Sequence, residues 1–349
     1  MRDEILRLGV VGCGWAGQQA VLAAAAGPRT QVVAVSDLDE RLRQQVASES
    51  SVPRQYEGYE ELYRDEQVEA VYLAVNPVMR YPMVMDALAA GKHVLVQKPH
   101  AVRAAQIREF ERAAEGAGRI LQFCYFMRHY PHNRQVRAAV QQGRIGEPYH
   151  ARVFLKCNTL PAAEGITRWL QVYGQKGGAL GQHASHEVDL AWWWLGCPRP
   201  LWAFAARHCV YPVYDGPEGP AEDYISGLVG LEGGKTLQID CSRWLHADTP
   251  TSVEVYGAEG AISGGKISRF EEGRYLVEEV DLPGDVAHSE PPREGLFFYY
   301  ELEHFAMAVA GLVEVDVNAK DAYSFMQILD GLYDSARVGE KVAIECALE

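Results

Sequence analysis

The segment Gly12-Cys13-Gly14-Trp15-Ala16-Gly17 constrains the fold of this chain more than any other feature. It follows a short apolar run at residues 8–11 and opens a helical stretch that stops at Gly27-Pro28. In such a strand–turn–helix unit, the first glycine makes the turn, the second lets the backbone approach a pyrophosphate, and the third allows close helix packing. The free N–H groups that begin the helix attract phosphate. We therefore expect Gly12, Gly14, Trp15, Ala16 and Gly17 to contact a dinucleotide.

An acidic residue closes the next apolar run. Asp37 follows residues 32–36 and stands twenty positions after Gly17. A carboxylate at this place accepts hydrogen bonds from the ribose hydroxyls and repels a 2′-phosphate. The expected cofactor is therefore NAD, with NADP as the weaker alternative because Arg41 can accommodate a phosphate.

Short apolar runs alternate with helical stretches in the first third of the chain. Strands are expected at residues 68–75, 93–96 and 120–123, with helices between them, which is typical of a parallel sheet. After about residue 128 the apolar runs lengthen, and glycine-containing turns separate them, which favours a mostly antiparallel sheet. The pattern predicts an α/β protein with a dinucleotide-binding domain at residues 1–128 and a second domain at residues 129–349.

Charge and composition exclude several classes of function. The 349 residues include 33 Lys and Arg against 47 Asp and Glu, a formal net charge of -14, so we expect no nucleic-acid partner. No apolar run reaches membrane-spanning length, and the acidic N-terminus does not resemble a secretory signal, so we expect no membrane partner. The seven Cys form no C-x-x-C pair, which favours a reduced, cytoplasmic setting.

Two further motifs can carry chemistry. Lys98 follows the strand expected at residues 93–96 and precedes Pro99, at the sheet edge where ligands bind; an ordinary surface lysine is the alternative. The segment 177–190 contains His183 and, three positions later, His186, which can exchange a proton near neutral pH. A core histidine bonded to a carbonyl is the alternative for His186. His183, His186 and Glu187 do not have H-E-x-x-H spacing, so no metal is expected.

Taken in order, these motifs resemble those of the Gfo/Idh/MocA family of oxidoreductases over nearly the whole chain. The likeness includes Gly12, Gly14 and Gly17, then Gly91-Lys92-His93-Val94 with Lys98-Pro99, and Arg144-Ile145-Gly146-Glu147-Pro148. It implies a Rossmann domain followed by an α/β domain with a large open sheet, and a sugar, cyclitol or related polyol bound between the two. It also implies a homo-oligomer, either a dimer or a tetramer.

The resemblance implies roles for individual residues. Hydride would move between nicotinamide and a hydroxyl carbon of the substrate, with Lys98 and His186 as the catalytic residues. The remaining implied contacts are Asn76 and Gln97 with the cofactor, and Tyr125, Arg128, Trp169, Tyr173, Gln182 and His183 with the substrate.

The chain also departs from the family pattern. Gln182 stands where members often carry Asp, and Gln97 stands where they carry Glu. Glutamine cannot act as a general base, so the catalytic carboxylate is missing or is supplied elsewhere. Two alternatives to a dehydrogenase stay open, and the change at Gln182 motivates the second. One is a glycoside hydrolase or lyase that retains NAD and oxidises the sugar only transiently. The other is a sensor of the same fold without catalysis.

Overall fold

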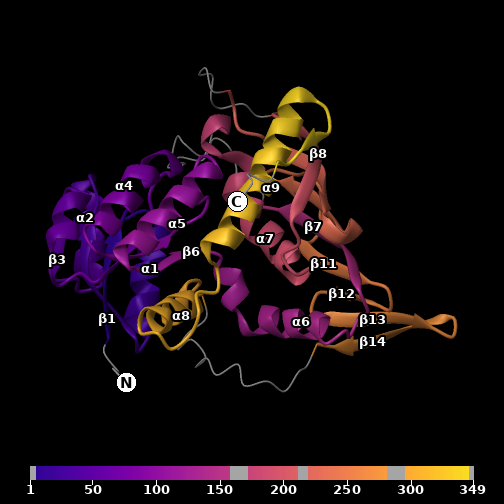
Figure 1. Ribbon diagram of the computed structural model, residues 1–349, viewed down its shortest axis with the longest axis horizontal. Coiled ribbons are helices and arrows are strands. Elements are labelled where there is room, and N and C mark those ends of the chain that lie inside the picture. The colour runs from indigo at the N-terminus through magenta and orange to yellow at the C-terminus, as the bar shows by residue number, and fades with distance from the viewer. Residues whose placement is uncertain (1–4, 158–171, 211–218, 281–294, 346–349) are drawn as a thin grey trace. The chain divides into compact units, whose positions relative to one another are not determined.

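The computed structural model describes residues 5–157, 172–210, 219–280 and 295–345 (Figure 1). Contacts divide the chain into one unit of Met1–His129 with Ala287–Tyr323 and a second of Tyr130–Val286 with Ser324–Glu349. The first break lies one residue from the expected boundary. Residues 295–323, which the sequence assigned to the second domain, group with the first unit because α8 (Tyr299–Val309) packs against α1 (Trp15–Ala26).

The first unit contains a six-stranded sheet in which every strand pair is parallel. Its order is β3-β2-β1-β4-β5-β6, and the residues of β4 and most of β5 are buried, as in a sheet covered on both faces. This confirms the predicted parallel sheet. The strands are β1 (Leu6–Val11), β2 (Thr30–Ser36), β3 (Arg54–Tyr56), β4 (Ala70–Leu73), β5 (His93–Val96) and β6 (Leu121–Phe123).

Helices connect these strands, and local capping defines several of their ends. Asp39 accepts hydrogen bonds from two backbone amides at the start of α2, and Asn76 accepts one at the start of α4. Gly118, in the left-handed region, ends α5. The remaining helices of this unit, besides α1 and α8, are α2 (Glu40–Glu49), α3 (Tyr59–Arg64), α4 (Pro77–Ala89), α5 (Ala105–Ala117) and η1 (Phe126–His129).

The second unit contains a nine-stranded sheet with the order β14-β13-β12-β11-β7-β10-β9-β8-β15. Its described pairs are antiparallel except that β10 runs parallel to β7, so the expected mostly antiparallel sheet is confirmed. The strands are β7 (Pro148–Lys156), β8 (Pro200–His208), β9 (Tyr224–Leu231), β10 (Thr236–Ser242), β11 (Ser252–Gly257), β12 (Ala261–Ser263), β13 (Lys266–Glu271), β14 (Arg274–Glu279) and β15 (Val342–Ala343).

One face of this sheet is buried and the other is partly open. In β10, Leu237 and Ile239 are buried, and the intervening Gln238 is half-buried on the other face. Helix α7 packs against β7, β10 and β11. The helices of the unit are α6 (Pro131–Gln141), η3 (Tyr173–Gln175), η4 (Ala179–Ala184), α7 (Ser185–Trp194), η5 (Glu232–Gly234) and α9 (Ala319–Val338), whose first residues belong to the first unit. In the described ranges, no helix is long and apolar enough to cross a membrane.

Candidate cofactor and substrate site

The three glycines of the turn after β1 occupy different surroundings. Gly12 has a φ of 96°, and a Cβ there would lie 2.5 Å from the carbonyl oxygen of Ala74. A Cβ on Gly17 would lie 1.8 Å from the carbonyl oxygen of Gly12. A Cβ on Gly14 would meet no atom within 4 Å. The protein's own packing therefore requires glycine at positions 12 and 17, whereas the exposed Gly14 borders open space that a ligand can fill.

The start of helix α1 is suited to an anion. Gly14 is the N-cap and supplies no side-chain hydrogen bond, and the first turn contains no acidic residue. The amide groups of the first turn are therefore available to phosphate oxygens, and the helix dipole favours negative charge there. Trp15 is 60% exposed, with its ring 5.7 Å from that of Phe297, and Ala16 beside it is half-buried. This turn fits the pyrophosphate of a dinucleotide.

Asp37 is held beside the turn by two backbone amides. Its Oδ2 accepts a hydrogen bond from Cys13 N at 2.6 Å, and its Oδ1 accepts one from Asp39 N at 2.9 Å. These bonds leave acceptor capacity on both carboxylate oxygens for ribose hydroxyls. Burial, reinforced by the charge of Asp37, raises the pKa of the Cys13 thiol to about 12. Cys13 is therefore a protonated packing residue and not a nucleophile.

Asn76 and Gln97 both have structural partners inside the first unit. The Asn76 side chain accepts a hydrogen bond from Val78 N at 3.0 Å and so caps α4. The Gln97 amide donates to the hydroxyl of Tyr72 at 2.7 Å and accepts from Lys98 N, also at 2.7 Å. These contacts orient the loops that follow β4 and β5. A direct contact of either residue with the cofactor stays a prediction.

Lys98 follows β5, at the carboxyl end of the parallel sheet, and a buried arginine supports its backbone. Arg80 donates hydrogen bonds to the carbonyl oxygens of Val75 and Lys98, at 2.5 and 3.2 Å. Burial lowers the pKa of Arg80 to about 9, which leaves it a cation at neutral pH. Arg80 therefore ties together the loops that follow β4 and β5. Sequence reasoning did not assign it this role because both of its partners are backbone atoms.

Tyr125 and Arg128, two expected substrate contacts, are fully buried. The Tyr125 ring packs edge-on against His100, with centroids 4.7 Å apart. Arg128 donates to Asp321 with an N–O distance of 2.8 Å, so this carboxylate neutralises its charge within the first unit. An anionic ligand at Arg128 would have to compete with Asp321. Substrate contact by these two residues stays a prediction.

The second group of candidate residues lies where a π-helix precedes an α-helix. Gln182 and His183 are half-buried residues of the π-helix η4, and the buried His186 is in the first turn of α7. Segments with π-helical geometry are rare and are often found at functional sites. Gly178 begins this segment with a φ of 91°, and a Cβ there would lie 2.6 Å from the carboxyl group of Glu222. The glycine-rich sequence before His183 is therefore required by local packing.

Two residues anchor the start of η4. Glu222 accepts a hydrogen bond from Leu180 N at 2.9 Å, and the Tyr333 hydroxyl accepts one from Gly181 N, also at 2.9 Å. Burial raises the pKa of the Glu222 carboxyl to about 7. Sequence reasoning missed both anchors, which are 42 and 152 residues from the amides that they accept. No local spacing links them to His183.

The raised pKa of Glu222 predicts a specific pH dependence of stability. In the folded protein this carboxyl keeps its proton up to about pH 7, whereas its ordinary pKa is 4.5. Its contribution to stability is therefore fully present below pH 4.5 and is lost as pH rises through 7. Glu222→Gln keeps an acceptor for Leu180 N but cannot ionise. Between pH 5 and pH 8 the variant should gain about 2–3 kcal/mol relative to wild type in urea unfolding.

The exposed carboxyl of Glu340, in the same unit, provides the matched control. Glu340→Gln should follow the wild-type pH profile. Parallel stability profiles for wild type and Glu222→Gln would show that Glu222 does not retain its proton in the folded state.

The structure leaves the other substrate predictions open. Trp169 lies outside the described residues, and Tyr173 begins η3. Lys98 belongs to the first unit and His186 to the second.

Comparisons with known proteins agree with this fold. Residues 6–125 match the model of the oxidoreductase family with an NAD-binding Rossmann fold, and residues 133–263 match the Gfo/Idh/MocA C-terminal domain. A 1,5-anhydro-D-fructose reductase from Ensifer adhaerens is 27% identical over 98% of this chain and 99% of its own. A trans-1,2-dihydrobenzene-1,2-diol dehydrogenase from Mus musculus is 30% identical over 73% of each chain.

A solved structure extends the likeness to the whole fold. Levoglucosan dehydrogenase, in complex with NADH and levoglucosan, superposes with a TM-score of 0.84 at 19% identity, over 98% of this chain and 100% of its own. With both family models matched in order and the glycine turn and Asp37 in position, this chain belongs to the Gfo/Idh/MocA family of NAD-binding oxidoreductases.

Proposed function

We propose that this protein is an NAD-dependent dehydrogenase or reductase that transfers hydride between nicotinamide and a hydroxyl-bearing carbon of a sugar, cyclitol or related polyol. The observation that carries the proposal is the turn at Gly14. This turn combines open space beside Gly14 with a helix start that no side chain caps. The Asp37 carboxylate also lies there, 2.6 Å from Cys13 N. The relatives named as a reductase of an anhydro sugar and a dehydrogenase of a vicinal diol support the class of substrate.

The proposed mechanism assigns proton handling to Lys98 and His186. Hydride leaves a carbinol carbon only as its hydroxyl loses a proton, so a base must be within hydrogen-bond reach. His186 would take up that proton, and the Lys98 ammonium would stabilise the developing alkoxide. Gln182 and His183 would bind and orient neighbouring hydroxyl groups. Bound NAD supplies the hydride acceptor, and these residues supply position and charge.

The carboxylate of Asp37 should determine the choice between NAD and NADP. Asp37→Asn removes the charge that repels a 2′-phosphate, so the ratio of NADP to NAD affinity should rise about tenfold or more. Asp39→Asn is the matched control, because it removes an equal charge two residues away and asparagine still caps α2. Titration calorimetry with both cofactors measures the effect. An equal shift in both variants would contradict a specific contact between Asp37 and the ribose.

Gln182 favours a second candidate function. Because this side chain is neutral, a carboxylate that many family members use is absent from η4. An enzyme that retains NAD and oxidises the sugar transiently, for hydrolysis or elimination, needs no net release of NADH. A non-catalytic sensor needs neither Lys98 nor His186, so the presence of both favours an enzyme.

A substrate panel distinguishes these functions. We would incubate the purified protein and NAD with anhydro sugars, cyclitols and trans vicinal diols, and follow NADH absorbance together with substrate loss. Continuous NADH formation on one class supports a dehydrogenase. Substrate loss without net NADH supports the NAD-retaining enzyme, and binding without either supports the sensor.

The open face of the nine-stranded sheet supports a homo-oligomer. On this half-exposed side, a guanidinium nitrogen of Arg152 lies 2.7 Å from a carboxylate oxygen of Glu254. The Tyr224 hydroxyl donates a hydrogen bond to Asp240 Oδ1 at 3.0 Å. We expect a dimer or a tetramer in solution, which sedimentation velocity can measure.

A further inference from the structure

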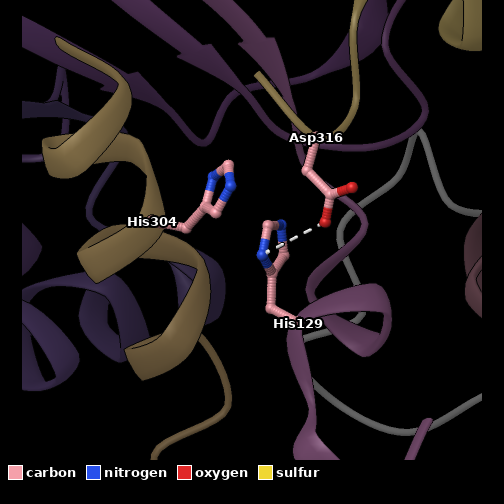
Figure 2. Close-up of side chains that lie close together, drawn as sticks. All are labelled: His129, His304 and Asp316. Atoms are coloured by element: carbon pink, nitrogen blue, oxygen red, sulfur yellow. Dashed lines mark ion pairs between the residues drawn. The ribbon is translucent and has the colours of Figure 1, made fainter. Parts of the chain in front are cut away.

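We propose that His129, His304 and Asp316 form a binding site for one divalent transition-metal ion of the zinc class. Each residue offers one ligand atom, and the three atoms all lie within 4.8 Å of one another. Figure 2 shows the three side chains grouped together, with Asp316 Oδ2 3.6 Å from His129 Nδ1. The two imidazole rings are 4.7 Å apart between centroids.

Three separate segments of the first unit supply these ligands. His129 is the last residue of η1, His304 is on α8, and Asp316 lies in the connection from α8 to α9 (Figure 2). Because 175 positions separate His129 from His304, no local spacing in the sequence indicates the site. The candidate metal ligands weighed from sequence spacing are His183, His186 and Glu187, and these belong to the second unit.

Burial and ligand chemistry determine which ion the site would take. His129 is fully buried and His304 is 7% exposed, whereas the Asp316 side chain is 19% exposed. Two imidazole nitrogens and one carboxylate oxygen suit Zn²⁺, Co²⁺ or Ni²⁺, while Mg²⁺ and Ca²⁺ prefer oxygen ligands. The partly exposed side, at Asp316, leaves a fourth position for water.

The ligand atoms must move closer together when an ion binds. With bonds of about 2.0–2.1 Å, ligand atoms around tetrahedral zinc lie roughly 3.3 Å apart. The separations, all within 4.8 Å, would therefore contract by at most about 1.5 Å. Rotation of the partly exposed Asp316 side chain and small shifts of the two rings can supply this movement. The cluster is therefore close to a ligating geometry without being in one.

The neighbouring charges do not oppose a cation. Arg128 precedes His129 in the chain, but the Asp321 carboxylate, 2.8 Å from the Arg128 guanidinium, neutralises its charge. Glu303 adjoins His304 and accepts a hydrogen bond from Arg29 N at 3.1 Å. The carboxylate of Asp316 consequently gives the site a net charge that favours a divalent ion. Binding would join the last residue of η1 and the middle of α8 to the segment before α9, and so stabilise the first unit.

The test is metal binding by the full-length protein after treatment with a chelator and dialysis. Titration with Zn²⁺ against a chromophoric competitor should give one tight site per chain, with a Kd in the micromolar range or below. Zn²⁺ should also raise the Tm by several degrees, whereas Mg²⁺ should not, because it does not bind. Co²⁺ should give the intense visible absorption of a four-coordinate complex.

Two variants and a control make the result specific. His304→Gln and Asp316→Asn should each weaken Zn²⁺ binding at least tenfold, because each removes one of three protein ligands. His208→Gln removes an exposed histidine of the second unit and should bind as wild type does. If His304→Gln does not fold, Asp316→Asn decides the test, since it is nearly isosteric and partly exposed.

The proposed site would be contradicted if Asp316→Asn bound Zn²⁺ as tightly as wild type. It would also be contradicted if His208→Gln lost as much Zn²⁺ affinity as the two ligand variants. The proposal is independent of the substrate and cofactor assignments. Zn²⁺ binding at this site can be found even if the protein neither binds NAD nor turns over a polyol. Likewise, NAD binding and polyol turnover can be found in a protein that does not bind Zn²⁺.

Discussion

Lys98→Met is expected to lower kcat roughly 10³-fold, with little change in NAD affinity. Groups that handle protons or stabilise charge in a transition state typically contribute about 10²- to 10⁴-fold. Lys98 lies at the carboxyl end of β5, and Gln97 and Arg80 both bond to its backbone. Methionine matches the four-atom aliphatic part of the lysine side chain and removes the ammonium group with its charge. The loss should therefore affect the transition state, where alkoxide charge develops, more than the binding of substrate.

Steady-state kinetics on the best substrate of the panel would measure this effect, together with NAD titration. Lys320→Met is the matched control, because Lys320 is an exposed lysine in the first turn of α9. It should retain wild-type kinetics. A Lys98→Met enzyme with wild-type kcat would exclude Lys98 from the chemistry, and a loss confined to KM would make it a substrate-binding residue only.

Gly14→Val is expected to weaken NAD binding about a hundredfold or more and to leave the Tm unchanged. Gly14 has extended backbone angles, φ of -67° and ψ of -172°, which valine can adopt. A Cβ there meets no protein atom within 4 Å, so the substitution causes no clash at this atom in the apo protein. It would instead occupy the space through which a pyrophosphate approaches the backbone amides.

The opposite behaviour is expected of Gly17→Ala. Its Cβ would lie 1.8 Å from the carbonyl oxygen of Gly12, so the turn must shift, and overpacking of this kind costs about 1–3 kcal/mol. The Tm should fall for Gly17→Ala and not for Gly14→Val. Calorimetry for NAD and thermal unfolding of both variants provide the comparison. Wild-type NAD affinity in Gly14→Val would mean that the cofactor does not bind at this turn.

Local patterns in the sequence were sufficient to predict much of the first unit. The strand–turn–helix at Gly12 to Gly17, the acidic residue that closes β2 and the lysine after β5 each depend on neighbours within a few residues. Hydrophobic periodicity likewise predicts the parallel sheet. Strand β3 and helix α3 were not expected, because three and six residues are too few to establish a period.

Features that depend on distant contacts could not be predicted in this way. Nothing in the sequence of helix α8 itself indicates that it packs on α1. The parallel pairing of β10 with β7 also depends on a connection through other strands. Glu222 and Tyr333 act on η4 from far along the chain, and His129 meets His304 only in the folded protein.

The proposed activity is hydride transfer between nicotinamide and a hydroxyl-bearing carbon of a polyol. The most direct measurement is the mass of the nucleotide after incubation of the protein with NAD and a panel polyol deuterated at its carbinol carbons. Hydride transfer predicts NADH that carries deuterium and accumulates as the polyol is consumed. Unlabelled NAD throughout, with every polyol of the panel unchanged, would contradict it.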